Sequence, residues 1–283
     1  MRRVDQQIAL VTGGASGLGK AIAQRLAFDG ARVVITDVQP GLGEPTASEC
    51  GFTFLEQDVC DETRWTEVVR EVEQRCGRLD ILVNNAGILG PADAMNLESA
   101  KLSDWRRVFA VNVEGILLGC RTAISAMRRA GGGAIINISS VAGLLATPYA
   151  PAYGASKATV RHLTKTVAQH CAQQKLNIRC NAVYPGVVRT PLWERHAEDQ
   201  ARQRGLSIDD LIAETKATIP LGEFTLPEDV AAAVSFLASS DARQVTGAEL
   251  IVDGGLVSCD TYAMSLNRPN MRPSLCVSES KHP

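Results

Sequence analysis

The stretch "LVTGGASGLGKAIAQRLA", Leu10–Ala27, joins an apolar run to a helical pattern through a glycine-rich turn. Gly14, Gly19 and Lys20 satisfy most of the phosphate-loop pattern G-x-x-x-x-G-K-[S/T], which is typical of nucleotide hydrolases and kinases. That loop needs a Ser or Thr hydroxyl directly after the lysine to hold magnesium, and the residue here is Ala21. The stretch therefore lacks the magnesium ligand that a phosphate loop requires.

A dinucleotide-binding turn is the other interpretation of this stretch. The spacing G-x-G-x-x-G is not met, because an isoleucine stands at its last glycine position, but T-G-x-x-x-G-x-G is met by Thr12, Gly13, Gly17 and Gly19. Glycines at these positions let the backbone approach a pyrophosphate, and a helix that begins near Gly17 offers free N–H groups to it. A purely structural strand-to-helix turn would also explain the glycines.

Asp37 ends the next strand-like run, "ARVVITD", and sharpens the dinucleotide interpretation. A carboxylate at that point can accept hydrogen bonds from both ribose hydroxyls of an adenosine, and it would repel a 2′-phosphate. Ser16 and Val38 lie close enough to pair with such a phosphate, yet neither carries a positive charge. The sequence therefore favours NAD over NADP, with a strand-ending turn residue as the simpler explanation of Asp37.

Apolar runs alternate with helical patterns along the chain. The runs are "IALVTGG", "ARVVITD", "FTFLEQDV", "LDILVNNAG", "GAIINISS", "IRCNAVYPG" and "GAELIVDGG". Helical spacing covers residues 20–28, 63–76, 105–129, 153–173 and 227–239. This alternation predicts a parallel sheet covered on both faces. We expect one α/β domain over residues 1–257, a doubly wound Rossmann-type fold with a seven-stranded parallel sheet, and ligands at the carboxyl ends of its strands.

Three segments depart from this pattern. Residues 38–51, "VQPGLGEPTASECG", contain prolines and glycines that leave little uninterrupted helix, so we expect a short helix and a loop. Residues 190–220 have helical spacing, and we expect a mobile lid over the substrate. The tail, residues 258–283, has no clear periodicity; we expect it to be irregular or to pack on a neighbouring subunit.

The composition argues against several classes of partner. The chain has 29 basic and 31 acidic residues without a basic block, so we expect neither nucleic-acid nor membrane binding. We find no signal-peptide pattern and no apolar run of transmembrane length, which indicates a cytoplasmic protein. Eight scattered cysteines with no C-x-x-C pair are expected to be reduced packing residues. The four histidines form no ligand cluster, so we expect no metal site.

A set of short motifs in a fixed order narrows the class of protein. The motifs are "TGGASGLG", "DV" at 58–59, "NNAG" at 84–87, Asn112 in "FAVNVEG", "ISS" ending at Ser140, "YGASK" at 153–157 and "PGVVRTP" from Pro185. On these motifs the chain resembles the short-chain dehydrogenase/reductase family over nearly all of residues 7–257. The general pattern is similar to bacterial hydroxysteroid and cyclic-alcohol dehydrogenases.

Elementary chemistry gives three of these residues compatible roles. Tyr153 and Lys157 are four residues apart, so on a helix they share one face. A free tyrosine titrates near 10, and we expect the lysine ammonium and the positive nicotinamide to lower that pKa. Tyr153 would then exchange a proton with the substrate oxygen while hydride is transferred, and the Ser140 hydroxyl would hold that oxygen. An exposed tyrosine, a solvated lysine and a helix-capping serine are the simpler explanations.

The resemblance implies roles for the remaining motif residues. Asn112 would complete a catalytic set by bending a helix and holding a water that links Lys157 to solvent. Asp58 and Val59 would flank the adenine, and Lys157 would also reach the nicotinamide ribose. The complete set expected to bind the cofactor is Gly13, Ser16, Gly17, Leu18, Gly19, Asp37, Val38, Asp58, Val59, Asn85, Ala86, Gly87, Tyr153, Lys157, Pro185, Gly186, Val188 and Thr190.

The loops near the reacting carbon are apolar, and they suggest a hydrophobic secondary alcohol or ketone as substrate. They are "VAGLLATPYAP" after Ser140 and the segment that begins "TPLWERHAEDQ" after the proline–glycine turn. The side chains expected to line the substrate pocket are Leu144, Leu145, Tyr149, Tyr184 and Trp193.

The expected activity is an NAD-dependent alcohol dehydrogenase. An NADP-dependent 3-oxoacyl-thioester reductase and a catalytically silent NAD-binding regulator remain as alternatives. The helical segments 105–129 and 153–173 carry apolar residues on more than one face. In relatives the two matching helices pair across a two-fold axis, so we expect a homotetramer, with a dimer as the second choice.

Overall fold

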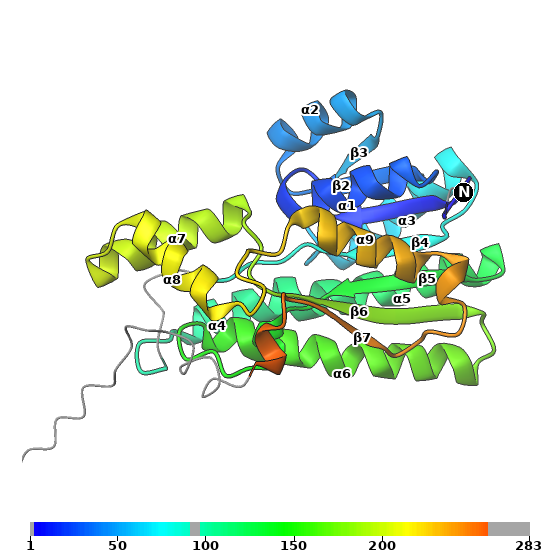
Figure 1. The fold of residues 1–283 in the computed structure, drawn as a ribbon. Helices are drawn as coiled ribbons and strands as arrows, with labels where there is room; N and C mark the ends of the chain where they lie inside the picture. The colour runs from blue at the N-terminus through cyan, green and yellow to red at the C-terminus, as the bar shows by residue number, and fades with distance from the viewer. Residues whose placement is uncertain (1–2, 91–96, 260–283) are drawn as a thin grey trace, which may run out of the picture.

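The computed structural model describes residues 3–90 and 97–259, and it contains one seven-stranded sheet in which every pairing is parallel (Figure 1). The strand order is β3-β2-β1-β4-β5-β6-β7. The strands are β1 (Ile8–Thr12), β2 (Arg32–Asp37), β3 (Thr53–Glu56), β4 (Ile81–Asn84), β5 (Gly133–Ile138), β6 (Ile178–Pro185) and β7 (Glu249–Val252). This is the expected Rossmann-like α/β fold, and the seven apolar runs of the sequence are its seven strands.

Helices cover both faces of the sheet. On one face, α1 and α9 pack on a buried apolar cluster that includes Ile22, Ile35 and Val234. On the other face, α3, α5 and α6 enclose a second cluster around Trp65, Leu82 and Val160. The helices are α1 (Gly17–Phe28), α2 (Pro40–Cys50), α3 (Glu62–Cys76), α4 (Leu102–Phe109), α5 (Gly115–Ala130), α6 (Pro151–Gln173), α7 (Pro191–Arg204), α8 (Ile208–Thr218) and α9 (Pro227–Ala238).

Helix α2 corrects the expectation of a short helix and a loop in residues 38–51. It runs without a break over Pro40–Cys50, with Pro40 in its first turn and Pro45 inside it. Gly43 has a packing role in this helix. A Cβ at this position would collide with the ring of Phe54 on β3. The glycine permits close packing of α2 on the sheet, and that tertiary contact outweighs the low helix propensity of the segment.

A π-helical turn, Ala110–Glu114, joins α4 to α5. The combined helix Leu102–Ala130 is long and apolar enough to cross a membrane by length and composition, which the sequence analysis did not find. It lies along the α5 face of the sheet, and 44% of its most apolar window is buried inside the protein. Buried polar Asn112 within it also indicates a helix of a protein core.

Helices α7 and α8 stand beyond the carboxyl ends of the strands (Figure 1). Each begins with a capped turn: Thr190 Oγ1 accepts a hydrogen bond from the Trp193 N–H, and Ser207 Oγ accepts one from the Asp210 N–H. The Trp193 ring packs edge-on against Phe224, with 4.9 Å between ring centroids. The α7–α8 segment is therefore held by a small group of apolar contacts, and it lies beyond the carboxyl ends of the strands, where ligands bind in this type of fold. Residues 260–283, most of the predicted tail, lie outside the described residues.

Candidate active site

A cleft of about 1070 Å³ opens at the carboxyl ends of the strands. It is lined by the β1–α1 turn, the ends of β2 to β6, the start of α6 and the α7–α8 segment. Every one of the 18 residues expected to bind a cofactor lines this cleft. So do Ser140, Tyr153 and Lys157 of the expected catalytic set.

The β1–α1 turn is held by close backbone packing. Gly13 has φ +63°, which favours glycine, and a Cβ there would lie 2.9 Å from the Ala86 Cα. A Cβ on Gly19 would fall on the carbonyl oxygen of Gly13. Ser16 is the N-cap of α1, yet its side chain makes no capping hydrogen bond. The first turn of α1 therefore presents backbone N–H groups and a free hydroxyl to the cleft, which suits a phosphate.

Asp37 lies at the end of β2, on the cleft wall. Its two carboxylate oxygens accept hydrogen bonds from the Ala15 N–H at 3.3 Å and the Gln39 N–H at 3.2 Å. These bonds fix the carboxylate beside the glycine turn, and its remaining lone pairs can accept from a ligand hydroxyl. Further along the wall, the carbonyl of Val59 accepts a hydrogen bond from Trp65 Nε1 at 2.9 Å, which anchors the 58–59 pair on α3.

The "NNAG" segment ties neighbouring strand ends together. Thr12 Oγ1 accepts hydrogen bonds from the N–H groups of Asn85 at 3.0 Å and Ala86 at 3.1 Å. Asn85 Nδ2 donates to the carbonyls of Thr12 at 2.9 Å and Gly13 at 3.1 Å. This ladder of bonds holds the floor of the cleft in place. At Gly186, on the opposite side, a Cβ would lie 2.7 Å from the Asp253 Cα, so only glycine permits the approach of the two segments.

The expected catalytic residues converge from three elements. Tyr153 and Lys157 are on α6, and Ser140 follows β5. Lys157 Nζ lies 5.6 Å from the Tyr153 ring centroid and donates to the Ile138 carbonyl at 2.9 Å. The Ser140 hydroxyl is close enough to the Tyr153 phenol to lower the pKa of that phenol. The phenol, the ammonium and the serine hydroxyl therefore lie at one end of the cleft.

Asn112 does not line the cleft but lies behind it, fully buried in the π-helical turn. Its Oδ1 accepts from the Ile88 N–H at 2.8 Å, and its Nδ2 donates to the Ile88 carbonyl at 2.9 Å and to Ser156 Oγ at 3.0 Å. Ser156 in turn donates to the Tyr153 carbonyl at 2.7 Å. The asparagine thus joins the strand β4 loop to the helix that carries Tyr153, and π-helical turns are frequent at functional sites.

Burial dominates the electrostatics of the two ionisable groups. It raises the pKa of Tyr153, while the nearby Ser140 hydroxyl acts in the opposite direction. It lowers the pKa of Lys157 to about 8, because the ammonium is far from water. The sequence predicts that the Lys157 ammonium and the nicotinamide together lower the pKa of Tyr153; in the protein without a cofactor, burial has the larger effect and raises it. Loss of hydration penalises the charged phenolate, and this effect is larger than the opposite effect of Ser140.

The substrate end of the cleft differs from expectation. Among the five predicted pocket residues, only Trp193 lines the cleft. Tyr184 is fully buried within β6, between β5 and β7, and Tyr149 is 66% exposed on the surface. Leu144 and Leu145 follow the short turn after Ser140 and also lie outside the lining. Sequence proximity to Ser140 did not reveal which way these side chains face.

Several residues that line this end were missed by sequence reasoning. They come mainly from α4, α7 and α8 and include charged and polar groups. They are Arg107, Leu192, Arg195, His196, Gln200 and Thr215. The α7 members are spaced as one side of a helix, which is the signal that would have found them. The cleft is thus more polar here than the apolar loops suggested.

Comparison with known proteins agrees with the geometry. A family profile described as enoyl-(acyl carrier protein) reductase matches residues 13–257. An NADP-dependent (R)-specific alcohol dehydrogenase of Lentilactobacillus kefiri is 37% identical over 89% of this chain and 97% of its own length. A 3-beta-hydroxysteroid dehydrogenase of Comamonas testosteroni is 36% identical over 90% and 97%, and a cyclopentanol dehydrogenase of Comamonas sp. (strain NCIMB 9872) is 39% identical over 90% and 98%.

These likenesses cover most of the chain at well over 30% identity, so the chain belongs to the short-chain dehydrogenase/reductase family. It is an oxidoreductase of that family, for which a nicotinamide cofactor is expected. The residues present suit such a cofactor: an uncapped helix N-terminus for its diphosphate, a carboxylate at the end of β2 for a ribose, and a cleft long enough to reach Tyr153.

Proposed function

We propose that the protein is an NAD-dependent dehydrogenase that interconverts a secondary alcohol and its ketone. The observation that carries this proposal is the single cleft that joins the free N-terminus of α1 at one end to Ser140, Tyr153 and Lys157 at the other. The names of the relatives support the substrate class, since they act on an (R)-alcohol, a hydroxysteroid and cyclopentanol.

Asp37 is the basis for NAD rather than NADP. Its carboxylate would accept hydrogen bonds from the adenosine ribose and would repel a 2′-phosphate at the same position. Neighbouring Ser16 and Val38 bring no positive charge to that end of the cleft. Asp58 and Val59 would flank the adenine, and Val188 and Thr190 would hold the carboxamide.

In the proposed reaction a bound oxidised nicotinamide would accept hydride from the carbinol carbon. Tyr153, as phenolate, takes the hydroxyl proton, so that the alcohol loses a proton and a hydride and becomes the ketone. The reverse reaction returns the proton from the Tyr153 hydroxyl to the carbonyl oxygen. The Ser140 hydroxyl donates a hydrogen bond to the substrate oxygen as negative charge develops on it.

Lys157 supplies the positive charge that favours the phenolate during this proton transfer. Its pKa of about 8 lets the ammonium release its proton to solvent at modest cost. This suits a group that helps to return Tyr153 to the phenolate form after each proton transfer. Asn112 positions this pair through Ser156, and we propose that it also holds the water that connects Lys157 to solvent.

Turnover with a panel of steroid, terpene, aryl and aliphatic secondary alcohols, followed by absorbance of the reduced nicotinamide, tests the proposal. Each alcohol is assayed with NAD+ and with NADP+. Tyr153→Phe should lower kcat by about 10²–10⁴-fold while NAD+ still binds, because only the proton transfer is lost. If the wild type binds NAD+ but oxidises no alcohol in the panel, a regulator that uses the same fold becomes the better explanation.

A reductase of 3-oxoacyl thioesters is the second candidate. It is favoured by the acyl carrier protein named in the matching family profile and by Arg107 and Arg195, whose positive charges line the cleft and would attract an anionic carrier. This candidate uses the same catalytic residues with NADP. Reduction of an acetoacetyl thioester with NADPH at a rate far above any alcohol oxidation with NAD+ would establish it in place of the first proposal.

We also propose that the chain assembles as a homotetramer, with a dimer as the second choice, and that the α7–α8 segment acts as a lid. The assembly is supported by exposed apolar side chains on the combined α4–α5 helix, such as Leu102 and Leu117. Sedimentation equilibrium tests it: a mass near that of one chain would contradict the proposal.

A further inference from the structure

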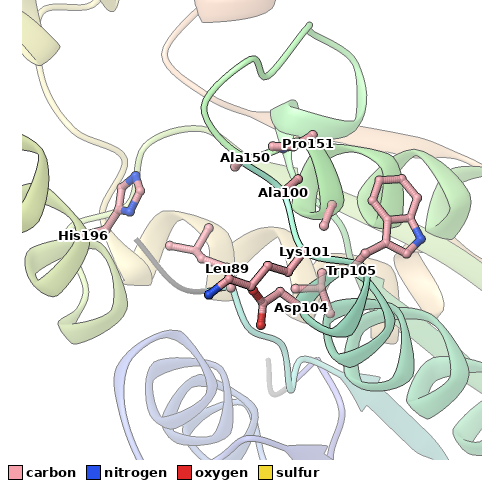
Figure 2. Close-up of a pocket in the computed structure, with 11 residues that line it drawn as sticks. Leu89, Ala100, Lys101, Asp104, Trp105, Ala150, Pro151 and His196 are labelled. Carbon is pink, nitrogen blue, oxygen red and sulfur yellow. The ribbon is translucent and has the colours of Figure 1, made fainter. Parts of the chain in front are cut away.

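A small side pocket lies next to the substrate end of the cleft (Figure 2). It is formed by residues 89–90 and 100–101, helix α4, the start of α6, and one residue of α7. Its lining residues are Leu89, Gly90, Ala100, Lys101, Asp104, Trp105, Val108, Ala150, Pro151, Ala152 and His196. Apart from Leu89 and His196, none of these belongs to the lining of the main cleft.

Leu89 and His196 line both spaces, so the side pocket continues the cleft rather than standing apart from it. Figure 2 shows His196 projecting from α7 on one side, with Leu89 and the α4 residue Asp104 across from it and Ala150 and Pro151 above them in this view. Because α6 also carries Tyr153, its first residues connect this pocket to the catalytic end of the cleft.

The size of the pocket limits what it can hold. Its volume is about 30 Å³. A site needs roughly 10–15 Å³ on this measure to hold one water molecule. The pocket therefore accepts a group of one or two heavy atoms, and a ring must stay in the main cleft.

The chemistry of the lining limits the group further. His196 is half-buried, and burial lowers its pKa, so at neutral pH its ring offers one N–H donor and one nitrogen acceptor. Lys101 and Asp104 bring charges of opposite sign at the start of α4, and the rest of the lining is mainly apolar. A neutral hydrogen bonder is accommodated better than an ion, since among the described lining residues the opposite charges of Lys101 and Asp104 offset each other.

We propose that the side pocket is the far end of the substrate site, and that His196 binds an uncharged hydroxyl or carbonyl group of the substrate there. The substrate is then a secondary alcohol or ketone with a second oxygen at the end remote from the reacting carbon. This inference rests on the proposed dehydrogenase function and revises the purely hydrophobic substrate expected from the loops.

His196 is also well placed to sense occupancy of the cleft, because it belongs to the α7–α8 segment. A hydrogen bond between the substrate and His196 would join that segment to the wall formed by α4 and α6. Substitution of a residue that merely packed within α7 would affect all substrates alike, whereas substitution of a binding residue has a larger effect on substrates with the far oxygen.

Matched substrates on one skeleton test the proposal. We would compare decalin-2-ol, decalin-2,6-diol and 6-hydroxydecalin-2-carboxylate, and the corresponding cyclohexane series, with the wild type, His196→Leu and His196→Asn. His170→Leu, the same change at an exposed position on α6, is the matched control. Thermal unfolding shows that each variant is folded, and initial rates give kcat and KM separately.

The wild type should prefer the diol over the plain alcohol by about 10-fold in kcat/KM, the worth of one hydrogen bond. His196→Leu should bring this ratio close to one, mainly through a higher KM for the diol. His196→Asn should retain part of the preference, and His170→Leu all of it.

A preference that persists in His196→Leu overturns the inference, as does a wild type that treats diol and plain alcohol alike or prefers the carboxylate. In each of those cases turnover that depends on Tyr153 leaves the proposed function in place. Failure of the proposed function gives a different result, since no member of either series would then be oxidised with NAD+ or NADP+.

Discussion

The two ends of the cleft differ in how their residues are fixed. At the cofactor end, the contacts are made to the backbone: Gly19 packs on the Gly13 carbonyl, and the Asn85 side chain donates to the carbonyl groups of Thr12 and Gly13. At the substrate end, the lining consists of side chains from α4, α6, α7 and α8 that meet only through tertiary packing. All predicted cofactor residues line the cleft, whereas one of the five predicted pocket residues does.

This difference teaches that a site built on strand ends and glycine turns is encoded locally, and a site built between helices is not. Backbone approach demands glycine at a fixed spacing, which a sequence displays directly. The identity of pocket residues depends on helix orientation, which the sequence displays only as periodicity. Four predictions test the contrast, beginning with Lys157, which is expected to serve both cofactor binding and catalysis.

The largest effect is expected from Lys157→Met. Activity should fall by about 10²–10⁴-fold, because the charge that favours the phenolate is lost. Stability should rise at pH 7, because burial lowers the pKa of Lys157 from 10.5 to about 8, and the folded protein carries a destabilised ammonium below pH 8. The gain should be about 1–3 kcal/mol after allowance for the lost bond to the Ile138 carbonyl.

The pH dependence of that gain follows from the sign of the shift. Between about 8 and 10.5 the unfolded chain binds more protons than the folded protein, so wild-type stability rises with pH in this window. The advantage of Lys157→Met should shrink through it and vanish above it. Denaturant unfolding at several pH values measures this, with exposed Lys175→Met expected to change stability by less than about 0.5 kcal/mol. An advantage that is constant with pH would show that charge burial is not its cause.

The next effect is expected at the backbone-built end. Gly19→Ala should destabilise the protein by about 3 kcal/mol and weaken NAD+ binding at least 10-fold, because the new Cβ would fall on the Gly13 carbonyl oxygen. Gly41→Ala is the control: its Cβ meets nothing within 4 Å, and alanine is the better helix former, so a gain of about 0.5–1 kcal/mol is expected. Calorimetry of NAD+ binding and chemical denaturation measure both, and similar results for the two variants would refute the packing argument.

The strands and the long helices could be predicted from the sequence because hydrophobic periodicity determines both. Helix α2 could not, since the role of Gly43 depends on Phe54 of a neighbouring strand. Tyr184 illustrates the same limit at the site: its place before Pro185 puts it near the cleft in sequence, but the strand alternation and the flanking strands bury it completely. The place of His196 in the substrate site could not be predicted, because the residues opposite it in the pocket come from α4 and α6.

A moderate effect is expected from Asp37→Ser at the cofactor end. Loss of the carboxylate should weaken NAD+ binding about 10-fold, the worth of hydrogen bonds to a charged group, and should relax discrimination against NADP+. The serine can still accept part of the backbone bonding from Ala15 and Gln39, so the turn should remain folded. Binding constants for both dinucleotides measure the change. Unaltered selectivity would mean that another group discriminates between the cofactors.

The smallest effect is expected at Tyr149, which the sequence placed in the substrate pocket and the structure places outside it. Tyr149 is 66% exposed and lies outside the cleft lining, so Tyr149→Ala should change kcat/KM by less than about 2-fold. Trp193→Ala removes a ring that lines the cleft and packs on Phe224, so it should raise KM by roughly 10-fold or more. Steady-state kinetics with one oxidised alcohol compare the two. If Tyr149→Ala proves as harmful as Trp193→Ala, the loop after Ser140 must close onto the substrate, and the wall assigned to α4 and α7 would be incomplete.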